Sequence, residues 1–356
     1  MSLEAGSEIS REELQLAARN HGLPLEALRH EITPVGLHYL LTHFDIPYVD
    51  ASAWTLEIAG LVERPVTLAL ADIERRPART EVVTLECAGN GRALYAPHVI
   101  SQPWLQEAVG TAEWTGTPLA PILEEAGVAN EAAEVVFTGL DRGIQGDVEH
   151  LYERSLPLQE AQRDEILLAY AVNGQPLPPQ HGFPLRLIVP GWYGMTSVKW
   201  LAAITVVAEP FRGWQQDVAY RLRRSEEEQG EPVTRILPRA LMIPPGFPDF
   251  LSRTRFVEAG RVRLEGRAWS GWAPVERVEV SVDGGESWTD ASLGNPPGEF
   301  AWSGWAYDWE AEPGEYELSC RATDGLGNVQ PALAEWNYDG LCNNGVQRVR
   351  AVVRGT

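Results

Sequence analysis

Two kinds of hydrophobic pattern divide this chain. Up to about residue 210, short apolar segments rich in β-branched residues alternate irregularly with helical stretches. From residue 255 onward, apolar and polar residues alternate with the period of β-strands. The first pattern predicts a mixed α+β domain, because the elements do not follow the regular order of a βαβ fold. The second predicts an all-β sandwich of the immunoglobulin-like type.

The first part of the chain contains two predicted helices and several predicted strands. Residues 11–30 have helical spacing interrupted by a glycine and a proline, and residues 117–128 have helical spacing that ends at a glycine. We predict strands in the segments that combine apolar and β-branched residues: 54–62, 81–87, 134–141, 165–174, 184–191 and 198–209. These elements predict a first domain over residues 1–215, with residues 1–34 as a helical extension.

A charged and proline-rich segment follows the first domain. Residues 216–250 include RRSEEEQGEP and LPRALMIPPGFPDF, a composition that predicts a linker wrapping over a surface. Residues 251–356 form the predicted sandwich, in which DGG at 283–285 marks a hairpin turn. Cys320 falls within a predicted strand, where a buried core thiol is the favoured interpretation. Cys342 falls in a predicted loop and has no evident role.

Composition and charge narrow the classes of function. The chain has 356 residues, of which 44% are hydrophobic and 22% charged, and its formal net charge is -21. So acidic a protein is a poor partner for nucleic acid or an anionic membrane. No apolar run approaches the roughly 18 residues that span a bilayer. The start, MSLEAGSEIS, lacks the features of an export signal. We therefore expect a cytoplasmic location as written, or a periplasmic one if a signal was removed.

Cys87 gives the clearest indication of chemistry. None of the 3 cysteines belongs to a CxxC pair or a CxxCH motif, so zinc-ribbon and covalent haem sites are not expected. Cys87 ends an apolar segment and is followed by AGNGR, a turn of small residues that lets the backbone and sulfur approach a bulky ligand. Arg92 is close enough in sequence to favour the thiolate. From the residues alone, the sulfur is a core thiol, a nucleophile or a soft metal ligand.

A second cluster lies in the segment HGFPLRLIVPGWYGMTSVKW. It contains His181, Arg186 and Lys199 within otherwise apolar sequence. Cations are expensive to bury unless they are paired. Together they suit a phosphate or another polyanionic ligand, although each could instead cap a strand or face solvent.

These motifs together resemble the sulfite oxidase family of molybdenum-cofactor oxidoreductases. The first domain carries EVVTLECAGNGR, W-x-G-x-P-L, TGLD and LLAYAVNGQPLPPQHGFPLRLIVPGWYGMTSVKWL, and the second carries VERVEVSVDGGESW and CRATDGLGNVQP. The resemblance extends over about residues 35–350. It implies a molybdopterin-binding domain followed by an immunoglobulin-like dimerisation domain, and hence a homodimer.

The resemblance also implies a role for individual residues. Cys87 matches the cysteine whose sulfur binds molybdenum, a role that suits a soft thiolate. Arg92 matches an arginine that holds the substrate anion, and Tyr220 matches an active-site tyrosine that hydrogen-bonds the substrate. The positions that match residues holding the pterin and its phosphate are His43, Asp141, His181, Arg186, Ser197 and Lys199.

One position departs from the family pattern. Sulfite-oxidising members carry Arg-Asn-His where this chain has Leu-Thr-His at 41–43, so Leu41 replaces an arginine that contacts the substrate. Losing one charge-assisted contact weakens anion binding by about 1.5–3 kcal/mol, or roughly tenfold to a hundredfold. Three nearby cations are candidates to replace it: Arg75, Arg76 and Arg79.

Sulfite is the leading substrate. The expected reaction is oxidation of sulfite to sulfate by oxygen-atom transfer at molybdenum, with electrons passed to an external acceptor such as a cytochrome, because the chain has no haem motif. A related alternative is a molybdenum oxidoreductase acting on another small oxyanion or a sulfoxide, as in nitrate reduction. Two other classes are a hydrolase in which His43, His98 or His181 activates Cys87, and a non-catalytic module that binds through the tryptophans of the sandwich.

Overall fold

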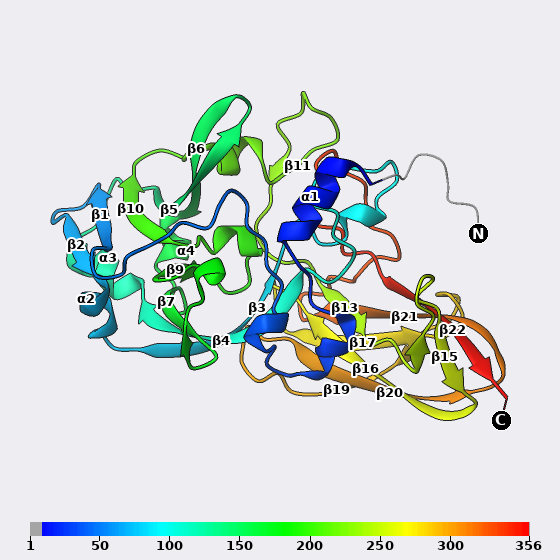
Figure 1. Ribbon diagram of the computed structural model, residues 1–356. Coiled ribbons are helices and arrows are strands. Elements are labelled where there is room, and N and C mark those ends of the chain that lie inside the picture. Colours follow the sequence, from blue (N-terminus) through cyan, green and yellow to red (C-terminus); the bar gives the residue numbers. More distant parts are fainter. Residues whose placement is uncertain (1–8, 356) are drawn as a thin grey trace.

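The computed structural model describes residues 9–355, whose strands fall into two separate groups (Figure 1). The N-terminal half contains two five-stranded sheets, and the C-terminal half contains a four-stranded and a six-stranded sheet. Residues 1–8, which contribute to the expectation about export, lie outside the described residues. None of the described helices is both long enough and apolar enough to cross a bilayer.

The first sheet of the N-terminal domain has five strands. In spatial order its strands are β2 (Val66–Ala69), β1 (Thr55–Gly60), β10 (Leu201–Val207), β5 (Glu134–Gln145) and β6 (Val148–Pro157). β1 and β10 pair in parallel, and the other pairs are antiparallel. Leu56 and Ile58 alternate with more exposed positions along β1 and are fully buried, as the period of a half-buried strand requires. Three short helices accompany the domain: α2 (Leu70–Glu74), α3 (Ala120–Ala126) and α4 (Leu158–Ala161).

The second sheet carries the segments from which the candidate chemistry comes. Its strands are β3 (Arg79–Glu86), β4 (Val109–Pro118), β7 (Leu167–Val172) and β8 (Gln175–Pro176), with β9 (Arg186–Ile188) paired to β7. The last four residues of β3 are buried, so the strand runs into the protein and ends directly before Cys87. β9 begins at Arg186, which is itself buried. The sheet therefore places both Cys87 and Arg186, which belong to the two candidate clusters of the sequence, in the interior.

The predicted N-terminal helix is shorter than its pattern suggests. α1 spans Arg11–Arg19 and begins with a capping box between Ser10 and Glu13. The chain then extends from Asn20, and only a short 3₁₀ turn, Leu25–Arg29, follows. The helix ends because the glycine and proline that follow cannot continue it. Further 3₁₀ turns are Val35–Leu37, Arg92–Leu94, Pro179–His181 and Gly194–Thr196, and Trp214–Val218 is a π-turn.

The C-terminal half is a two-sheet sandwich, as the alternating pattern predicts. The smaller sheet contains β13 (Arg239–Met242), β16 (Gly260–Trp269), β20 (Ser303–Ala311) and β19 (Ser292–Leu293). The larger contains β14 (Phe247–Pro248), β15 (Arg255–Glu258), β22 (Gln347–Arg354), β21 (Gly314–Asp324), β17 (Val275–Ser281) and β18 (Thr289–Asp290). Cys320 is a free, fully buried thiol in the core between them, which confirms the prediction of a buried core thiol.

The segment 216–250 is more ordered than the expected linker. β11 (Arg221–Leu222) pairs with β12 (Glu231–Pro232), and β13 is an entirely buried strand that pairs with β16. The physical reason is the apolar run Ala-Leu-Met at 240–242, whose burial in the sandwich outweighs the turn-forming effect of the prolines on either side. The segment thus belongs partly to the second domain.

Candidate active site

Cys87 lies where two cavities meet. Its amide donates to the Ala108 carbonyl at 2.9 Å, and its own carbonyl accepts the Asn90 amide at 2.9 Å, which closes the turn after β3. The turn continues through Gly91 at a φ of 89°, a left-handed conformation that favours glycine. Cys87 lines both an inner and an outer cavity. The sulfur is therefore at the point where a buried cofactor and an incoming substrate could both reach it.

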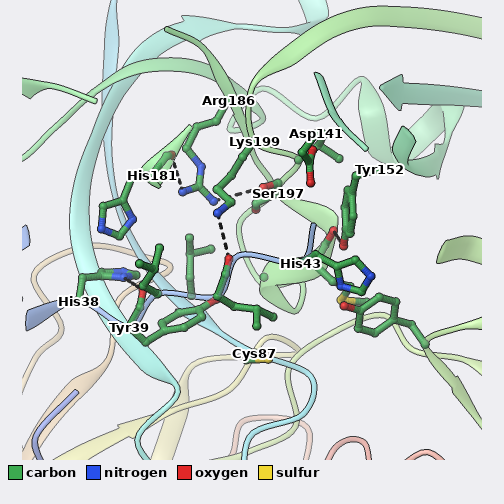
Figure 2. A pocket seen from close by; sticks show the side chains of 17 residues that line it. His38, Tyr39, His43, Cys87, Asp141, Tyr152, His181, Arg186, Ser197 and Lys199 are labelled. Atoms are coloured by element: carbon green, nitrogen blue, oxygen red, sulfur yellow. Dashed lines mark hydrogen bonds between the residues drawn. The ribbon is translucent and has the colours of Figure 1, made fainter. Parts of the chain in front are cut away.

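The inner cavity collects most of the residues that the resemblance assigns to the cofactor (Figure 2). They come from β5, from β9 and from the loops around them, and were far apart in the sequence. The expected residues that line this cavity are His43, Cys87, Asp141, His181, Arg186, Ser197, Lys199 and Tyr220.

The cations of the inner cavity are held without carboxylate partners. Arg186 donates to the carbonyls of His181 at 3.0 Å and Ser197 at 3.2 Å, and its guanidinium lies 4.7 Å from the centroid of a tryptophan ring. Lys199 Nζ donates to the carbonyl of Leu41 at 2.9 Å (Figure 2) and to that of Gln180 at 3.0 Å. Within residues 9–355, neither side chain forms an ion pair. Asp141 is the acidic residue near Lys199 in the cavity, but it forms no direct ion pair with either cation.

Burial determines the protonation of these groups. It lowers the pKa of Lys199 and raises the pKa of the neighbouring Asp141, because each charged form is desolvated. It also lowers the pKa of Arg186 to about 10 and the pKa of His38 to about 4. An anion bound in this cavity would favour the charged forms of Arg186 and Lys199.

Several buried polar atoms of the site lack a protein partner. Among the described residues, His38 Nε2, Thr42 Oγ1, Asp141 Oδ1 and Arg186 Nε are buried without a hydrogen bond. Buried polar groups are normally satisfied, so such atoms indicate a ligand. Arg186 and Lys199 suit the phosphate of a pterin cofactor, and the carboxylate oxygen of Asp141 suits the N–H donors of its ring.

The residues also fit a metal that brings most of its own ligands. Within residues 9–355, no group of three or more His, Cys, Asp or Glu side chains is arranged to hold a metal ion. A single sulfur from Cys87 would complete the coordination of a metal held mainly by a dithiolene. Thus the site suits a molybdopterin and does not suit a metal bound by protein side chains alone.

The outer cavity is a funnel of about 790 Å³ that runs from Cys87 toward the surface. Much of its wall is apolar or aromatic and includes Trp104, Trp214 and Trp336. Arg92 lines it as a mostly buried cation, whose Nε donates to the Asp339 carbonyl at 3.1 Å. This gives the funnel one cation close in sequence to the cysteine.

Arg223 is a second cation of the funnel. Its Nε and Nη2 donate to the two carboxylate oxygens of Asp339 at 2.7 and 3.1 Å. The pair neutralises itself, so the funnel carries much less positive charge than two arginines would suggest. Leu41 lines both cavities and adds no charge.

The three arginines that we considered as replacements for the missing cation do not line either cavity. They lie on the surface of the N-terminal domain, where each forms an ion pair with a neighbouring carboxylate: Arg75 with Asp72, Arg76 with Glu125 and Arg79 with Glu81. That hypothesis is wrong, because local acidic residues in the folded chain already engage these side chains.

Tyr220 lies at the junction, in the walls of both cavities. Its φ of 52° is unusual for a residue with a side chain and costs on the order of 1–3 kcal/mol, which is typical of functional positions. Burial raises the pKa of Tyr220 to about 12, so the phenol is a hydrogen-bond donor at neutral pH. The Arg154 guanidinium lies 5.7 Å from its ring centroid.

The environment of Cys87 differs from that of a nucleophile. Burial raises the pKa of Cys87 more than Arg92 lowers it, contrary to our expectation of a free thiolate. His43 bonds to Gln145 and His98 to Glu13, and within the described residues no histidine hydrogen-bonds to Cys87. A metal deprotonates a coordinating thiol outright, so the raised pKa does not oppose ligation. These observations disfavour the hydrolase alternative.

Sequence reasoning missed several residues of the two cavities. His38, Tyr39 and Tyr152 line the inner cavity, and Arg223 and Asp339 line the funnel. The only sequence signal was a histidine within the apolar run around residue 38. Arg223 and Asp339 are 116 positions apart, and nothing in the sequence links them.

Comparison with known proteins defines the class of this protein. A family model described as "Oxidoreductase molybdopterin binding domain" matches residues 43–215, and one described as "Mo-co oxidoreductase dimerisation domain" matches residues 245–354. The N-terminal domain is thus a molybdopterin-binding domain, and the C-terminal one is a dimerisation domain of molybdenum-cofactor oxidoreductases.

Similar proteins narrow the class to a family. The chain is 34% identical to mitochondrial sulfite oxidase of Mus musculus, over 90% of this chain and 62% of that protein. It is 33% identical to nitrate reductase [NADH] 1 of Arabidopsis thaliana, over 94% of this chain and 40% of that protein. The sulfane dehydrogenase SoxCD from Paracoccus pantotrophus has a similar structure, with a TM-score of 0.80, 26% identity and coverage of 98% of this chain and 92% of that one. The chain belongs to the sulfite oxidase family of molybdenum-cofactor oxidoreductases.

Proposed function

We propose that this chain oxidises sulfite to sulfate by oxygen-atom transfer and passes two electrons to an external acceptor. The reaction consumes water: sulfite and water give sulfate, two protons and two electrons. The observation that carries the proposal is the position of Cys87 between an inner cavity of unpaired cations and a funnel that contains Arg92 and Tyr220. We choose sulfite as the substrate because the chain is similar to proteins named sulfite oxidase.

The inner cavity would hold the cofactor. When bound, the molybdenum cofactor supplies the oxygen-atom transfer and takes up the electrons. Cys87 would provide the sulfur ligand from the protein, while Asp141 would accept hydrogen bonds from the pterin ring. We assign four residues to the phosphate and the adjoining part of the pterin, and His43 to the edge nearest the funnel. The four residues are His181, Arg186, Ser197 and Lys199.

The funnel would bind and orient the anion. Arg92 offers a planar fork of donors to the oxygens of sulfite and of the sulfate product. Because Leu41 is apolar and Asp339 neutralises Arg223, we expect weaker anion binding than in a pocket with two free arginines. Release of sulfate would be correspondingly easy.

Tyr220 would orient the substrate and hold a proton. Its phenol remains protonated through the physiological range, since burial raises its pKa to about 12. A neutral phenol can donate a hydrogen bond to an oxygen of the bound anion without adding charge. It can also relay a proton while the site is reoxidised.

The electron acceptor would lie outside the chain. We propose no haem in this polypeptide and an acceptor such as a cytochrome that docks near the funnel. We also propose a homodimer formed through the C-terminal domain, which matches the dimerisation domain of the family.

Nitrate reduction is the second candidate. The similarity to nitrate reductases extends over nearly the whole chain. The low positive charge of the funnel also suits a monoanion better than a compact dianion. A substrate that donates oxygen would then reverse the direction of electron flow.

A metal analysis combined with two assays tests the proposal. We expect about one molybdenum per chain and sulfite-dependent reduction of ferricyanide. Nitrate-dependent oxidation of a reduced viologen, without sulfite turnover, would support the second candidate instead. Purified, folded protein that is active without molybdenum would reject both.

A further inference from the structure

Glu86, the residue directly before Cys87, is fully buried and is held by the other domain. Its Oε1 lies 2.9 Å from Nε of Arg239, at the start of β13, and both side chains are 1% exposed. Its Oε2 accepts the indole N–H of Trp269, at the end of β16, at 2.7 Å. The side chain of Asn90 donates to Oε1 at 3.0 Å from within the turn itself. Two of the three partners therefore come from the C-terminal half of the chain.

The same half of the chain also binds the backbone of the turn. The Cys342 amide donates to the Ala88 carbonyl at 2.7 Å, and the Asn343 side chain donates to the Gly91 carbonyl at 2.9 Å. The bond from Arg92 to residue 339, described above, is a third contact with the same loop. The turn is thus tied to the second domain at both ends and at Ala88, directly after Cys87.

The small residues of AGNGR permit this approach. A Cβ placed on Gly91 would lie 2.9 Å from Asn343 Cβ, and one placed on Gly340 would lie 2.8 Å from Arg92 Cγ. Side chains at these positions would push the two domains apart. Gly91, which we expected to admit a ligand, therefore also admits the C-terminal loop, and Gly340 of that loop allows the approach from the other side.

We propose that Glu86 and Arg239 are positioning residues that hold the Cys87 sulfur at the junction of the two cavities. A buried ion pair contributes little to stability, because desolvation of the two charges offsets their attraction. Removing one partner is nevertheless strongly destabilising, since an unpaired buried charge remains. A pair with this property, next to a metal ligand, holds the turn in one arrangement. The second domain thereby has a role in the site of its own chain, besides dimerisation.

The consequence for Cys87 can be measured without the metal. We would prepare metal-free protein and follow alkylation of Cys87 by iodoacetamide, with the modified residue identified by mass spectrometry. The variants are Glu86→Gln, the double variant Glu86→Gln/Arg239→Met, and Glu279→Gln as a matched control. Glu279 is a buried carboxylate on β17 that pairs with Arg321 and Arg277 in the larger sheet of the second domain, away from the turn.

The proposal predicts a local effect that is separable from stability. In Glu86→Gln we expect Cys87 to react about tenfold faster, because the turn opens locally, while Glu279→Gln leaves the rate unchanged even where its Tm falls equally. The double variant leaves no unpaired charge, so its Tm should return toward that of the wild type while Cys87 still reacts faster. It keeps the test decisive if Glu86→Gln alone does not fold.

Two results would overturn the proposal: equal alkylation rates in Glu86→Gln and Glu279→Gln, or a wild-type rate in the double variant. The role toward the metal rests on the proposed function and has its own readout, the molybdenum–sulfur distance from X-ray absorption of the loaded protein. Absence of molybdenum from the wild type and all variants would reject the proposed function and would not affect the alkylation comparison.

Discussion

The inner cavity and the funnel hold their cations in opposite ways. In the inner cavity, Arg186 and Lys199 donate to backbone carbonyls and have no acidic partner among the described residues. In the funnel, Arg223 is bound by both oxygens of Asp339, and Leu41, which also lines the funnel, adds no charge. The inner cavity therefore has two cations free of direct ion pairs, with Asp141 near Lys199, whereas Arg92 is the one arginine in the funnel wall that has no carboxylate partner among the described residues.

This difference follows from what each end must bind. A cofactor stays in place through every turnover, so unpaired buried cations are compatible with one permanent polyanion. A substrate anion must enter as sulfite and leave as sulfate, and a second unpaired cation would hold the product as well as the substrate. Variants at the two ends should accordingly fail in different ways, by losing the cofactor or by changing KM.

The largest effect is expected at Cys87, where the two regions meet. In Cys87→Ser, sulfite-dependent turnover should fall by at least about 100-fold, because a serine oxygen is a harder and poorer ligand for the metal. Cys320→Ala is the matched control, since Cys320 is also a buried free thiol but lies in the sandwich core. Steady-state assays with ferricyanide measure both. Wild-type turnover in Cys87→Ser would show that the sulfur is not a ligand.

The next effect separates cofactor retention from substrate binding. Arg186→Met removes a buried cation from the inner cavity and should weaken cofactor binding by about tenfold to a hundredfold. Molybdenum content per folded chain is the measurement, with Arg186→Lys to retain the charge. The control is Arg163→Met, which loses a partly buried arginine that pairs with Glu160 and Glu165. Full molybdenum content in folded Arg186→Met would contradict the assignment of the inner cavity.

The sequence predicts the inner cavity much better than the funnel. The inner residues lie in contiguous motifs such as PLRLIVPGWYGMTSVKW, where cations within apolar strands are conspicuous. The funnel depends on Arg223 and Asp339, which are brought together only when the loop at 337–343 folds against the first domain. Each residue alone looks like an ordinary surface charge, so local sequence gives no sign of their pairing.

The fold shows the same division between local and distant information. The period of two predicts the sandwich, and the prolines correctly mark an irregular segment before it. The pattern does not show that Arg239–Met242 adds a strand to that sandwich or that its arginine reaches Glu86. The strand depends on pairing with β16, and the contact of Arg239 with Glu86 depends on packing between the two domains; neither has a local signature in the sequence.

Adding a cation at position 41 should make the charge of the funnel more like that of the inner cavity. In Leu41→Arg, the KM for sulfite should fall by about tenfold to a hundredfold, because one charge-assisted contact is added. Molybdenum content should remain unchanged, and kcat should fall only if sulfate release becomes rate-limiting. An unchanged KM would mean that the side chain at 41 does not reach the anion. The control is Leu94→Arg, which adds the same charge at an exposed position that lines neither cavity.

The smallest effect concerns the carboxylate that neutralises Arg223. In Asp339→Asn, Arg223 loses its ionic partner while the backbone carbonyl of residue 339 still accepts from Arg92. The Asp339 side chain is 25% exposed, so screening limits the effect. The KM for sulfite should fall by up to about fivefold, the equivalent of the 0.2–1 kcal/mol typical of partly exposed pairs. Added salt should diminish the difference from wild type. Glu335→Gln, which breaks the exposed pair with Arg224, should leave the KM unchanged. A rise in the KM of Asp339→Asn would show that Asp339 orders Arg223 for the substrate and does not compete with it.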